Sequence, residues 1–287
     1  MKSLAVFAWV GVVLVCSGSA GRGHDKPANT ADEQLKEIRG TFDKLGAEHS
    51  LVTNPLTKQT EHHFRMPRAT TDDDLEKLKS LSSNPFPFGL KCIYTKVTDA
   101  GLKELKDLKG LTLLHIDGPN VTDAGLKELR DLKSLADLSL QGARVTDVGI
   151  KELKGLTNLT SLSLQRTRVT DAGLKELKDL TSLSKLGLSF TKVTDVGLKD
   201  LNHLKNLTWL ELYQTPVTDA GLAELKGLEN LSSLFLGRTK VSDAGLRELK
   251  ALKNLIYISL NDTRVTAAGV KELQEALPNC QIKARIR

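Results

Sequence analysis

Apolar residues recur along most of the chain with two periods that alternate. From about residue 70 onward, leucines first return every three positions and then every second position, and this alternation continues almost to the end. Leu102, Leu105 and Leu108 have the three-residue spacing, which predicts one face of a short helix. Leu114 and Ile116 have the two-residue spacing of a short strand. The pattern therefore predicts a series of short helix–strand pairs.

The alternation has a constant length. A segment Val-Thr-Asp-Ala-Gly-Leu, with small changes, returns every 24 residues and starts at Val97, Val121, Val145, Val169, Val193, Val217, Val241 and Val265. Thr98 or Asp99 supplies the N-cap oxygen of the helix, and the repeated aspartates are expected to form a helix-capping column. Gly101 is expected to let the helix start pack closely on its neighbour. Because one unit cannot bury its apolar face alone, we expect stacked units with one continuous core.

The strand segments carry a family resemblance. Leu114-x-Ile116, Leu138-x-Leu140 and Leu162-x-Leu164 resemble the leucine-rich repeat. Threonine replaces the usual asparagine of the loop at Thr95, Thr167, Thr191, Thr215, Thr239 and Thr263. This variety of repeat is similar to those of secreted bacterial leucine-rich-repeat proteins and of the ribonuclease-inhibitor-like group. The resemblance covers about residues 70–287. It implies an α/β solenoid, a horseshoe with short parallel strands on its concave face and short helices on its convex face.

The first twenty residues have the pattern of a secretory signal peptide. Lys2 precedes an apolar run at residues 4–15, and small residues follow up to Ala20. The run is shorter than the ~20 apolar residues that cross a bilayer. We expect cleavage before Gly21 and a secreted, periplasmic or cell-envelope protein. Lipoprotein anchoring through Cys16 is less favoured, because branched residues precede that cysteine where small ones are needed.

Residues 21–69 are interpreted as a linker and an N-terminal helical cap region, and residues 70–287 as the repeat domain with its terminal capping units. Leu35, Ile38 and Phe42 lie on one stripe and predict a helix over residues 32–47. Between His49 and Arg68 the pattern predicts no element. His49, His62 and His63 are candidate ligands of a metal ion. Adjacent histidines point apart on a strand, so we expect loop or surface histidines and no metal.

Composition and motifs argue against several classes of function. The net charge of +6 comes from 41 basic and 35 acidic residues whose signs are interspersed, whereas a nucleic-acid-binding protein concentrates its basic charge on one face. No catalytic or phosphate-binding motif is found, so no enzyme, cofactor or metal is predicted. Cys92 and Cys280 are expected to lie far apart as inert thiols.

Residues that depart from the repeat consensus predict where a partner binds. Outward positions of the early strands are small or polar: Asp137, Ser139, Gln141, Ser161, Ser163 and Gln165. Later strands carry a predicted concave patch for a protein ligand, which comprises Phe190, Trp209, Glu211, Tyr213, Phe235 and Tyr257. Trp and Tyr are typical of binding hot spots. The alternative is ordinary cross-strand stacking that stabilises the sheet.

Other functions remain open from the sequence. The basic column Lys96, Arg144, Arg168, Lys192, Lys240 and Arg264 forms an edge ladder that could hold a glycan or another polyanion, or could be a solvated rim paired with nearby aspartates. Further alternatives are an adaptor similar to the substrate receptors of ubiquitin ligases, a structural envelope protein, and an enzyme with its site in residues 30–70. Five Asn-x-Ser/Thr sequons begin at Asn120, Asn158, Asn206, Asn230 and Asn261.

Overall fold

A computed structural model describes residues 30–53 and 60–285 of the chain. The predicted signal peptide, its cleavage site and Cys16 lie outside these residues. None of the helices in the described part is long and apolar enough to cross a membrane.

All strands belong to one sheet of eleven, in which they lie side by side in the order of the sequence. Only β1 and β2 pair antiparallel; every later neighbour pairs parallel. The strands are β1 (Glu48–Thr53), β2 (Thr60–Arg65), β3 (Phe88–Lys91), β4 (Leu111–His115), β5 (Asp137–Ser139), β6 (Ser161–Ser163), β7 (Lys185–Gly187), β8 (Trp209–Glu211), β9 (Ser233–Phe235), β10 (Tyr257–Ser259) and β11 (Gln281–Lys283).

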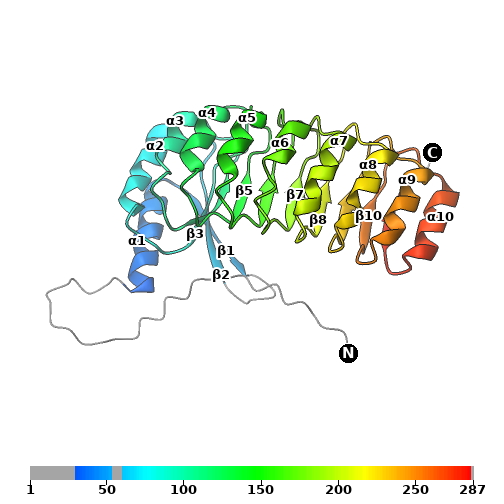
Figure 1. Cartoon of the computed structure of the whole chain (residues 1–287). Coiled ribbons are helices and arrows are strands. Elements are labelled where there is room, and N and C mark those ends of the chain that lie inside the picture. Colours follow the sequence, from blue (N-terminus) through cyan, green and yellow to red (C-terminus); the bar gives the residue numbers. More distant parts are fainter. Residues whose placement is uncertain (1–29, 54–59, 286–287) are drawn as a thin grey trace.

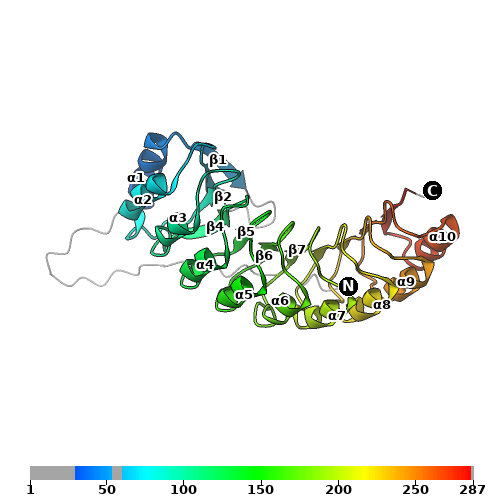
Figure 2. The same cartoon turned by 90° about the horizontal axis from the view of Figure 1, so that it is seen from above.

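One short helix follows each strand of the array from β3 to β10. The α-helices are α1 (Ala31–Lys44), α2 (Asp72–Glu76), α3 (Asp99–Lys103), α4 (Asp123–Leu126), α5 (Asp147–Ile150), α6 (Asp171–Lys175), α7 (Asp195–Leu198), α8 (Asp219–Glu224), α9 (Asp243–Glu248) and α10 (Ala267–Ala276). Turns of 3-10 helix extend several of them: η1 (Lys77–Leu81), η2 (Lys127–Leu129), η3 (Lys151–Leu153), η4 (Lys199–His203), η5 (Leu225–Gly227) and η6 (Leu249–Ala251). The array forms an arc, with the helices on its convex side and the strands on its concave side (Figures 1 and 2). The predicted solenoid is confirmed.

The leucines of both periods meet in one core. Leu102 of α3, Leu105 and Leu108 of the turns after it, Leu114 of β4 and Ile116 just after that strand are all at most 2% exposed. The same positions are buried in the following units, so the core runs without interruption along the array. The stability of such an array is a sum over units and over the contacts between neighbours.

The repeated threonine caps each helix. Thr98 has an extended backbone and its hydroxyl accepts a hydrogen bond from the N–H of Ala100, and the same contact recurs at the start of the later helices. Of the two cap candidates, threonine is therefore the N-cap residue. The prediction that the aspartates form a column of helix caps is wrong, because each aspartate is the first residue inside its helix.

Each of these aspartates instead holds the next unit. The Asp99 carboxylate accepts from the backbone N–H of Thr122 at 2.8 Å and from its hydroxyl at 2.6 Å. Equivalent pairs of hydrogen bonds join Asp72 to Thr98, Asp123 to Thr146, Asp147 to Thr170, Asp171 to Thr194, Asp195 to Thr218, Asp219 to Ser242 and Asp243 to Thr266. We call this set the aspartate clamp.

The glycine after each aspartate makes room for the clamp. A Cβ atom on Gly125 would lie 2.4 Å from an oxygen of Asp99, and a Cβ on Gly101 would lie equally close to Asp72. No side chain fits in that space. The expected close packing of the helix start on its neighbour is therefore present, and its reason is the carboxylate of the preceding unit.

The N-terminal segment extends the sheet of the array. Helix α1 forms close to its predicted position, with a capping box between Thr30 and Glu33. Its Phe42 stacks on Phe64 of β2 at 4.2 Å between ring centroids and meets the edge of Phe88 of β3 at 5.8 Å. These aromatic rings belong to the same buried core as the leucines of the repeats.

The segment for which the sequence predicted no element forms the β1–β2 hairpin, so the expectation of loop or surface histidines is wrong. His49 lies on β1, His62 and His63 lie on β2, and His63 is 4% exposed. His49 Nε2 and His62 Nδ1 share a hydrogen bond of 3.0 Å and their rings stack. His63 turns to the other side, where its Nε2 lies 3.1 Å from Glu61.

Candidate functional site

The predicted patch residues project from β8, β9 and β10 and from the turns beside them. All six, namely Phe190, Trp209, Glu211, Tyr213, Phe235 and Tyr257, are partly exposed. Leu210, Leu234 and Ile258, which alternate with them, are fully buried in the core. The alternation of a strand thus places the aromatic residues outward on the concave side. The aromatic rings are therefore partly open to solvent on this side.

Ring contacts divide the patch into two clusters. Trp209 packs against Phe235 with 4.6 Å between ring centroids, and Phe235 packs against Tyr257 at 5.2 Å. We call these three residues the aromatic row. Phe190 and Tyr213 form the other pair, at 5.3 Å. The sequence predicted one patch, and the structure brings its rings together in these two groups.

The second cluster continues into two arginines that the sequence analysis did not select. The Arg166 guanidinium lies 4.3 Å from the centre of the Phe190 ring, and that of Arg238 lies 5.6 Å from the centre of the Tyr213 ring. Both distances fit cation–π contacts. Arg166, Phe190, Tyr213 and Arg238 therefore form one stack, which we call the edge stack. Its signal in the sequence is the replacement of a turn glycine by a large side chain.

Glu211 connects the aromatic row to the polar strands before it. One carboxylate oxygen accepts from the indole N–H of Trp209 at 2.8 Å, and the other accepts from the side-chain amide of Gln165. Gln165 in turn lies over Gly187, where a Cβ atom would be 3.1 Å from its side-chain amide nitrogen and would leave that side chain little room. These bonds fix the orientation of the indole ring on the concave face.

The earlier strands present a polar concave surface. His115 Nε2 lies 3.1 Å from Asp137, and the Ser139 hydroxyl donates to Asp117 at 2.6 Å. Ser139 is 7% exposed, so it is less accessible than its outward strand position suggests. His115 and Asp117 were not selected from the sequence, although they stand at the same outward positions one unit earlier. Within the described segments, no group of three or more His, Cys, Asp or Glu side chains could hold a metal ion.

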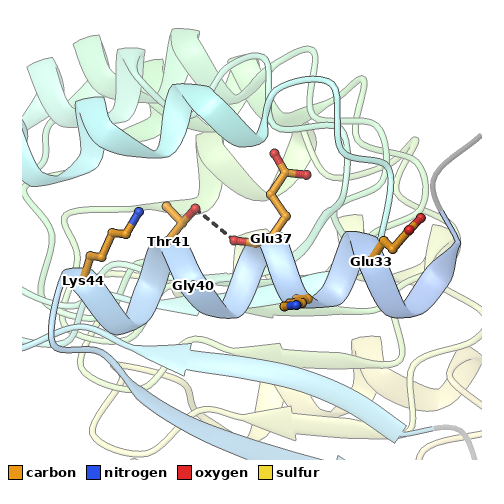
Figure 3. Close-up of a pocket in the computed structure, with 6 residues that line it drawn as sticks. Glu33, Glu37, Gly40, Thr41 and Lys44 are labelled. Carbon is orange, nitrogen blue, oxygen red and sulfur yellow. Dashed lines mark hydrogen bonds between the residues drawn. The ribbon is translucent and has the colours of Figure 1, made fainter. Parts of the chain in front are cut away.

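The N-terminal region offers only a shallow surface. Glu33, Glu37, Gly40, Thr41 and Lys44 line an open depression along the outer face of α1, together with Lys36 (Figure 3). The Thr41 hydroxyl donates to the backbone carbonyl of Glu37, and the Lys44 side chain lies apart from the two glutamates in the same view. All lining residues come from a single helix. This depression brings together no acid–base pair or nucleophile of the kind an enzyme site requires.

The basic edge ladder is exposed along the connections between strands and helices. Lys96, Arg144, Arg168, Lys192, Lys240 and Arg264 are all exposed, and none of them makes an ion pair within the described residues. The expected pairing with nearby aspartates is wrong, because the aspartate clamp uses those carboxylates. On the convex face, by contrast, basic side chains do form ion pairs: Arg130 Nη2 lies 2.8 Å from Glu152 Oε2.

Three of the sequon asparagines make hydrogen bonds between units, and the two described cysteines are buried. The Nδ2 atoms of Asn158, Asn206 and Asn230 donate to backbone carbonyls of the preceding unit at 2.8–2.9 Å, so these side chains help to join the units. Cys92 and Cys280 are free and buried, and burial raises the pKa of the Cys92 thiol to about 12. Burial also raises the pKa of Cys280. Both thiols are therefore poor nucleophiles.

Comparison with known proteins agrees with this geometry. A family model described as "Leucine Rich repeat" matches residues 155–178, which span one repeat length. The same unit recurs along the array. The array therefore has the leucine-rich-repeat fold. No curated protein matches its sequence.

Two solved structures of bacterial leucine-rich-repeat proteins are similar. Internalin C2 of Listeria monocytogenes matches with a TM-score of 0.54 and 25% identity, over 75% of this chain and 84% of the internalin. A leucine-rich-repeat protein of Leptospira interrogans matches with a TM-score of 0.52 and 24% identity, over 76% of this chain. The matched part is 51% of the Leptospira chain, about half its length. Both likenesses agree with the solenoid described above.

The leucine-rich-repeat architecture is in general a scaffold for protein interactions, and its curved sheet offers an extended concave surface for them. Fold alone does not decide which residues make the contact. On this array, the aromatic row and the edge stack are two places where aromatic rings take the place of polar side chains at the surface.

Proposed function

We propose that this leucine-rich-repeat protein is an exported, non-enzymatic scaffold that binds a protein partner on its concave face, over the aromatic row. The observation that carries the proposal is that Trp209, Phe235 and Tyr257 remain partly exposed on adjacent strands. The leucine core beneath is complete without them. Partly exposed aromatic clusters of this kind are typical of the energetic centre of protein interfaces.

Cross-strand stacking is the competing role for the same rings. Neighbouring aromatic side chains on a sheet contribute roughly 0.2–1 kcal/mol to stability per pair. A hot spot loses ~2 kcal/mol or more of binding free energy when truncated to alanine. The two roles therefore predict different consequences of Trp209→Ala: a loss of stability alone, or a loss of affinity with a small change in stability.

Photo-crosslinking locates the binding face before any partner is known. We expect a chain with a benzophenone amino acid at Tyr257 to form a specific adduct in an envelope extract. The matched control carries the same group at Val148, which is 61% exposed on the helical side. An adduct that forms equally well at both positions would contradict concave binding.

The partner identified in this way allows the affinity test. Trp209→Ala should weaken its binding at least ~30-fold, which corresponds to about 2 kcal/mol. Ser163→Ala is the matched control on the polar half of the concave face, because Ser163 is partly exposed on β6. Unchanged affinity of Trp209→Ala would assign the row to sheet packing alone.

Export is tested at the N-terminus. The proposal rests on the charged start, the apolar run at residues 4–15 and the small residues up to Ala20. N-terminal sequencing of the exported protein should begin at Gly21. A retained Met1, or a lipid-modified Cys16 as the first residue, would contradict cleavage at this site. With Trp9 removed, Trp209 is the only tryptophan and its emission becomes a probe of the concave face.

A further inference from the structure

Each strand from β3 to β10 is followed by a turn residue with a left-handed backbone. Two units use glycine there, Gly118 and Gly142. The other six use side chains at φ angles between 54° and 59°: Tyr94, Arg166, Phe190, Gln214, Arg238 and Asp262. Glycine adopts this conformation without steric cost, whereas arginine, phenylalanine and glutamine do not. Strain kept at the same position of consecutive units points to a use for the side chains.

The side chains at these turns contact one another from unit to unit. Arg166, Phe190 and Arg238 supply three of the four members of the edge stack, and Tyr213 supplies the fourth. Arg238 also lies 3.4 Å from both Gln214 Oε1 and Asp262 Oδ2. The left-handed turns thus hold a continuous row of planar groups at the edge where the strands β6 to β10 end.

Positive charge is concentrated on the same edge. The five connections that follow β6 to β10 are residues 165–168, 189–192, 213–216, 237–240 and 261–264. Their basic residues are Arg166, Arg168, Lys192, Arg238, Lys240 and Arg264. Asp262 is their only acidic residue. Of these cations, only Arg238 makes an ion pair in the described structure. Arg166 and Arg168 are both exposed, as are Lys240 and Arg264. Arg168, Lys192, Lys240 and Arg264 therefore have no carboxylate partner within the described residues, and Arg166 contacts only the Phe190 ring.

We propose that this edge binds an acidic polypeptide segment of the protein partner, with its carboxylates on Arg168, Lys192, Lys240 and Arg264 and its chain along the edge stack. The inference rests on the proposed function, because it assumes a protein partner, and it names the chemistry of that partner. Arginine pairs with carboxylates through two parallel hydrogen bonds, and an edge of planar groups favours a flat, extended chain.

The spacing of the units sets the length of the segment. Neighbouring units are about 4.8 Å apart, so five connections span ~19 Å, and an extended chain rises about 3.3 Å per residue. About six residues therefore cover the edge. A shorter acidic stretch reaches fewer cations and should bind more weakly.

A labelled peptide tests the proposal with the full chain. The probe is a fluorescein-labelled octapeptide of alternating glutamate and aspartate, followed by anisotropy at physiological salt. The double variant Arg168→Gln/Arg264→Gln should weaken its binding by about tenfold or more. The matched control, Lys96→Gln/Arg144→Gln, removes two exposed cations of the same ladder outside the five connections and should change affinity less than about twofold. Equal losses from the two double variants would overturn the proposal.

Two further probes separate other ligands of the edge. A glutamine–asparagine octapeptide of equal length should not bind, and measurable binding of it would contradict recognition through carboxylates. A heparin hexasaccharide should bind more weakly than the acidic peptide. If heparin binds more tightly and loses affinity in Arg168→Gln/Arg264→Gln, the edge takes an anionic glycan and the peptide proposal is wrong.

The left-handed position gives a test that misfolding cannot imitate. Arg166→Gly relieves the backbone strain and removes one member of the edge stack, so the melting temperature should hold or rise while peptide affinity falls several-fold. Unchanged affinity would show that the strained turn does not serve binding. Trp209→Ala should leave peptide affinity unchanged, so failure at the edge and failure of the aromatic row are distinguished.

Discussion

At the scale of single residues, the aspartate clamp carries the contact between neighbouring units on the helical side. Asp171 accepts from the Thr194 N–H at 2.7 Å and from its hydroxyl at 2.6 Å, and Gly197 leaves space for its carboxylate. Hydrogen bonds to a charged acceptor contribute more than neutral ones. Because the two groups belong to different units, the clamp couples the units as well as stabilising each.

We predict that Asp171→Ala lowers the free energy of unfolding by about 2–3 kcal/mol. The reason is that the substitution leaves two partly buried donors of Thr194 without an acceptor. Asp171→Asn should cost less, because its amide oxygen still accepts from the backbone N–H. Urea unfolding followed by circular dichroism measures both changes.

Asp179→Ala is the control, since Asp179 belongs to the same unit and is exposed. It should alter stability by less than about 0.5 kcal/mol, as exposed positions usually do. A similar loss from Asp171→Ala and Asp179→Ala would show that the clamp does not couple the units.

The aspartate column also shows what sequence periodicity can and cannot predict. Its position beside the helix start was evident, and the spacing correctly placed the helices, strands and leucine core. The partner of Asp171 lies 23 residues later in the chain. A repeat pattern does not say whether a side chain bonds within its own unit or to the next one. That choice depends on how far the stacked units are shifted, which only the three-dimensional arrangement shows.

At the scale of elements, a pair of histidines links the two strands of the β1–β2 hairpin, and β2 joins the hairpin to the array by pairing with β3. Burial is the largest cause that lowers the pKa of His49 and His62 below the usual 6.5. Arg39 lowers the pKa of His49 further, and His49, Arg39 and His63 lower the pKa of His62 further. Asp43 opposes the effect at His49. The hairpin is therefore most stable when both rings are neutral.

We predict that the stability of this hairpin falls as the pH drops below about 6.5. The unfolded chain binds protons at these histidines more readily than the folded chain does, so the free energy of unfolding rises with pH through this window and is lost in acid. Amide hydrogen exchange of β1 and β2 at pH 7 and at pH 5 measures the effect.

His62→Phe should weaken this pH dependence, since a phenyl ring keeps the stacking on His49 and the contact with Phe86 but cannot be protonated. His203→Gln is the control, because His203 is exposed on η4 at a distance along the chain. An unaltered dependence in His62→Phe would remove the histidine pair as its cause.

The hairpin and the binding residues mark the limit of the sequence analysis at this scale. Outward positions of Trp209, Phe235 and Tyr257 follow from strand alternation and were predicted. The hairpin was missed because β1 buries almost none of its side chains, so it has no alternating apolar pattern. The edge stack was missed because contacts such as Arg166 over Phe190 depend on a left-handed turn, which spacing does not reveal.

At the scale of the whole molecule, the constant repeat makes the array modular. Nearly every unit places its Leu core, its Thr or Ser cap and its aspartate at the same positions, and its helices and strands contact mainly those of the units beside it. The hydrogen bond between Gln165 and Glu211 is an exception, because it reaches across one intervening unit. In arrays of this kind, stability is close to a sum over units and nearest-neighbour contacts. Removal of a whole unit should therefore lower the stability of the array less than a deletion that shifts the register of the repeat.

We predict that deletion of residues 145–168 gives a folded array one unit shorter. The deletion joins Arg144 to Val169, so Asp123 meets Thr170 in place of Thr146 and the leucines stay in register. Deletion of residues 145–156 removes half a unit and should unfold much of the array, because it takes out α5 and η3 and joins β5 to β6 with no helix between them. Circular dichroism melts of both variants compare them, and equal damage would contradict modular stacking.

Ala267 interrupts the series of aspartate clamps. In the unit that begins at Val265, Thr266 still donates to the Asp243 carboxylate, but alanine stands where the other units have aspartate. An internal unit donates to the aspartate of the unit before it and supplies an aspartate to the unit after it, whereas this unit only donates. A gene duplication that copies an internal unit would lengthen the protein without breaking the chain of contacts. A copy of the unit at Val265, inserted anywhere earlier, would leave its successor's threonine without support. The unit at Val265 is thus not interchangeable with the units before it.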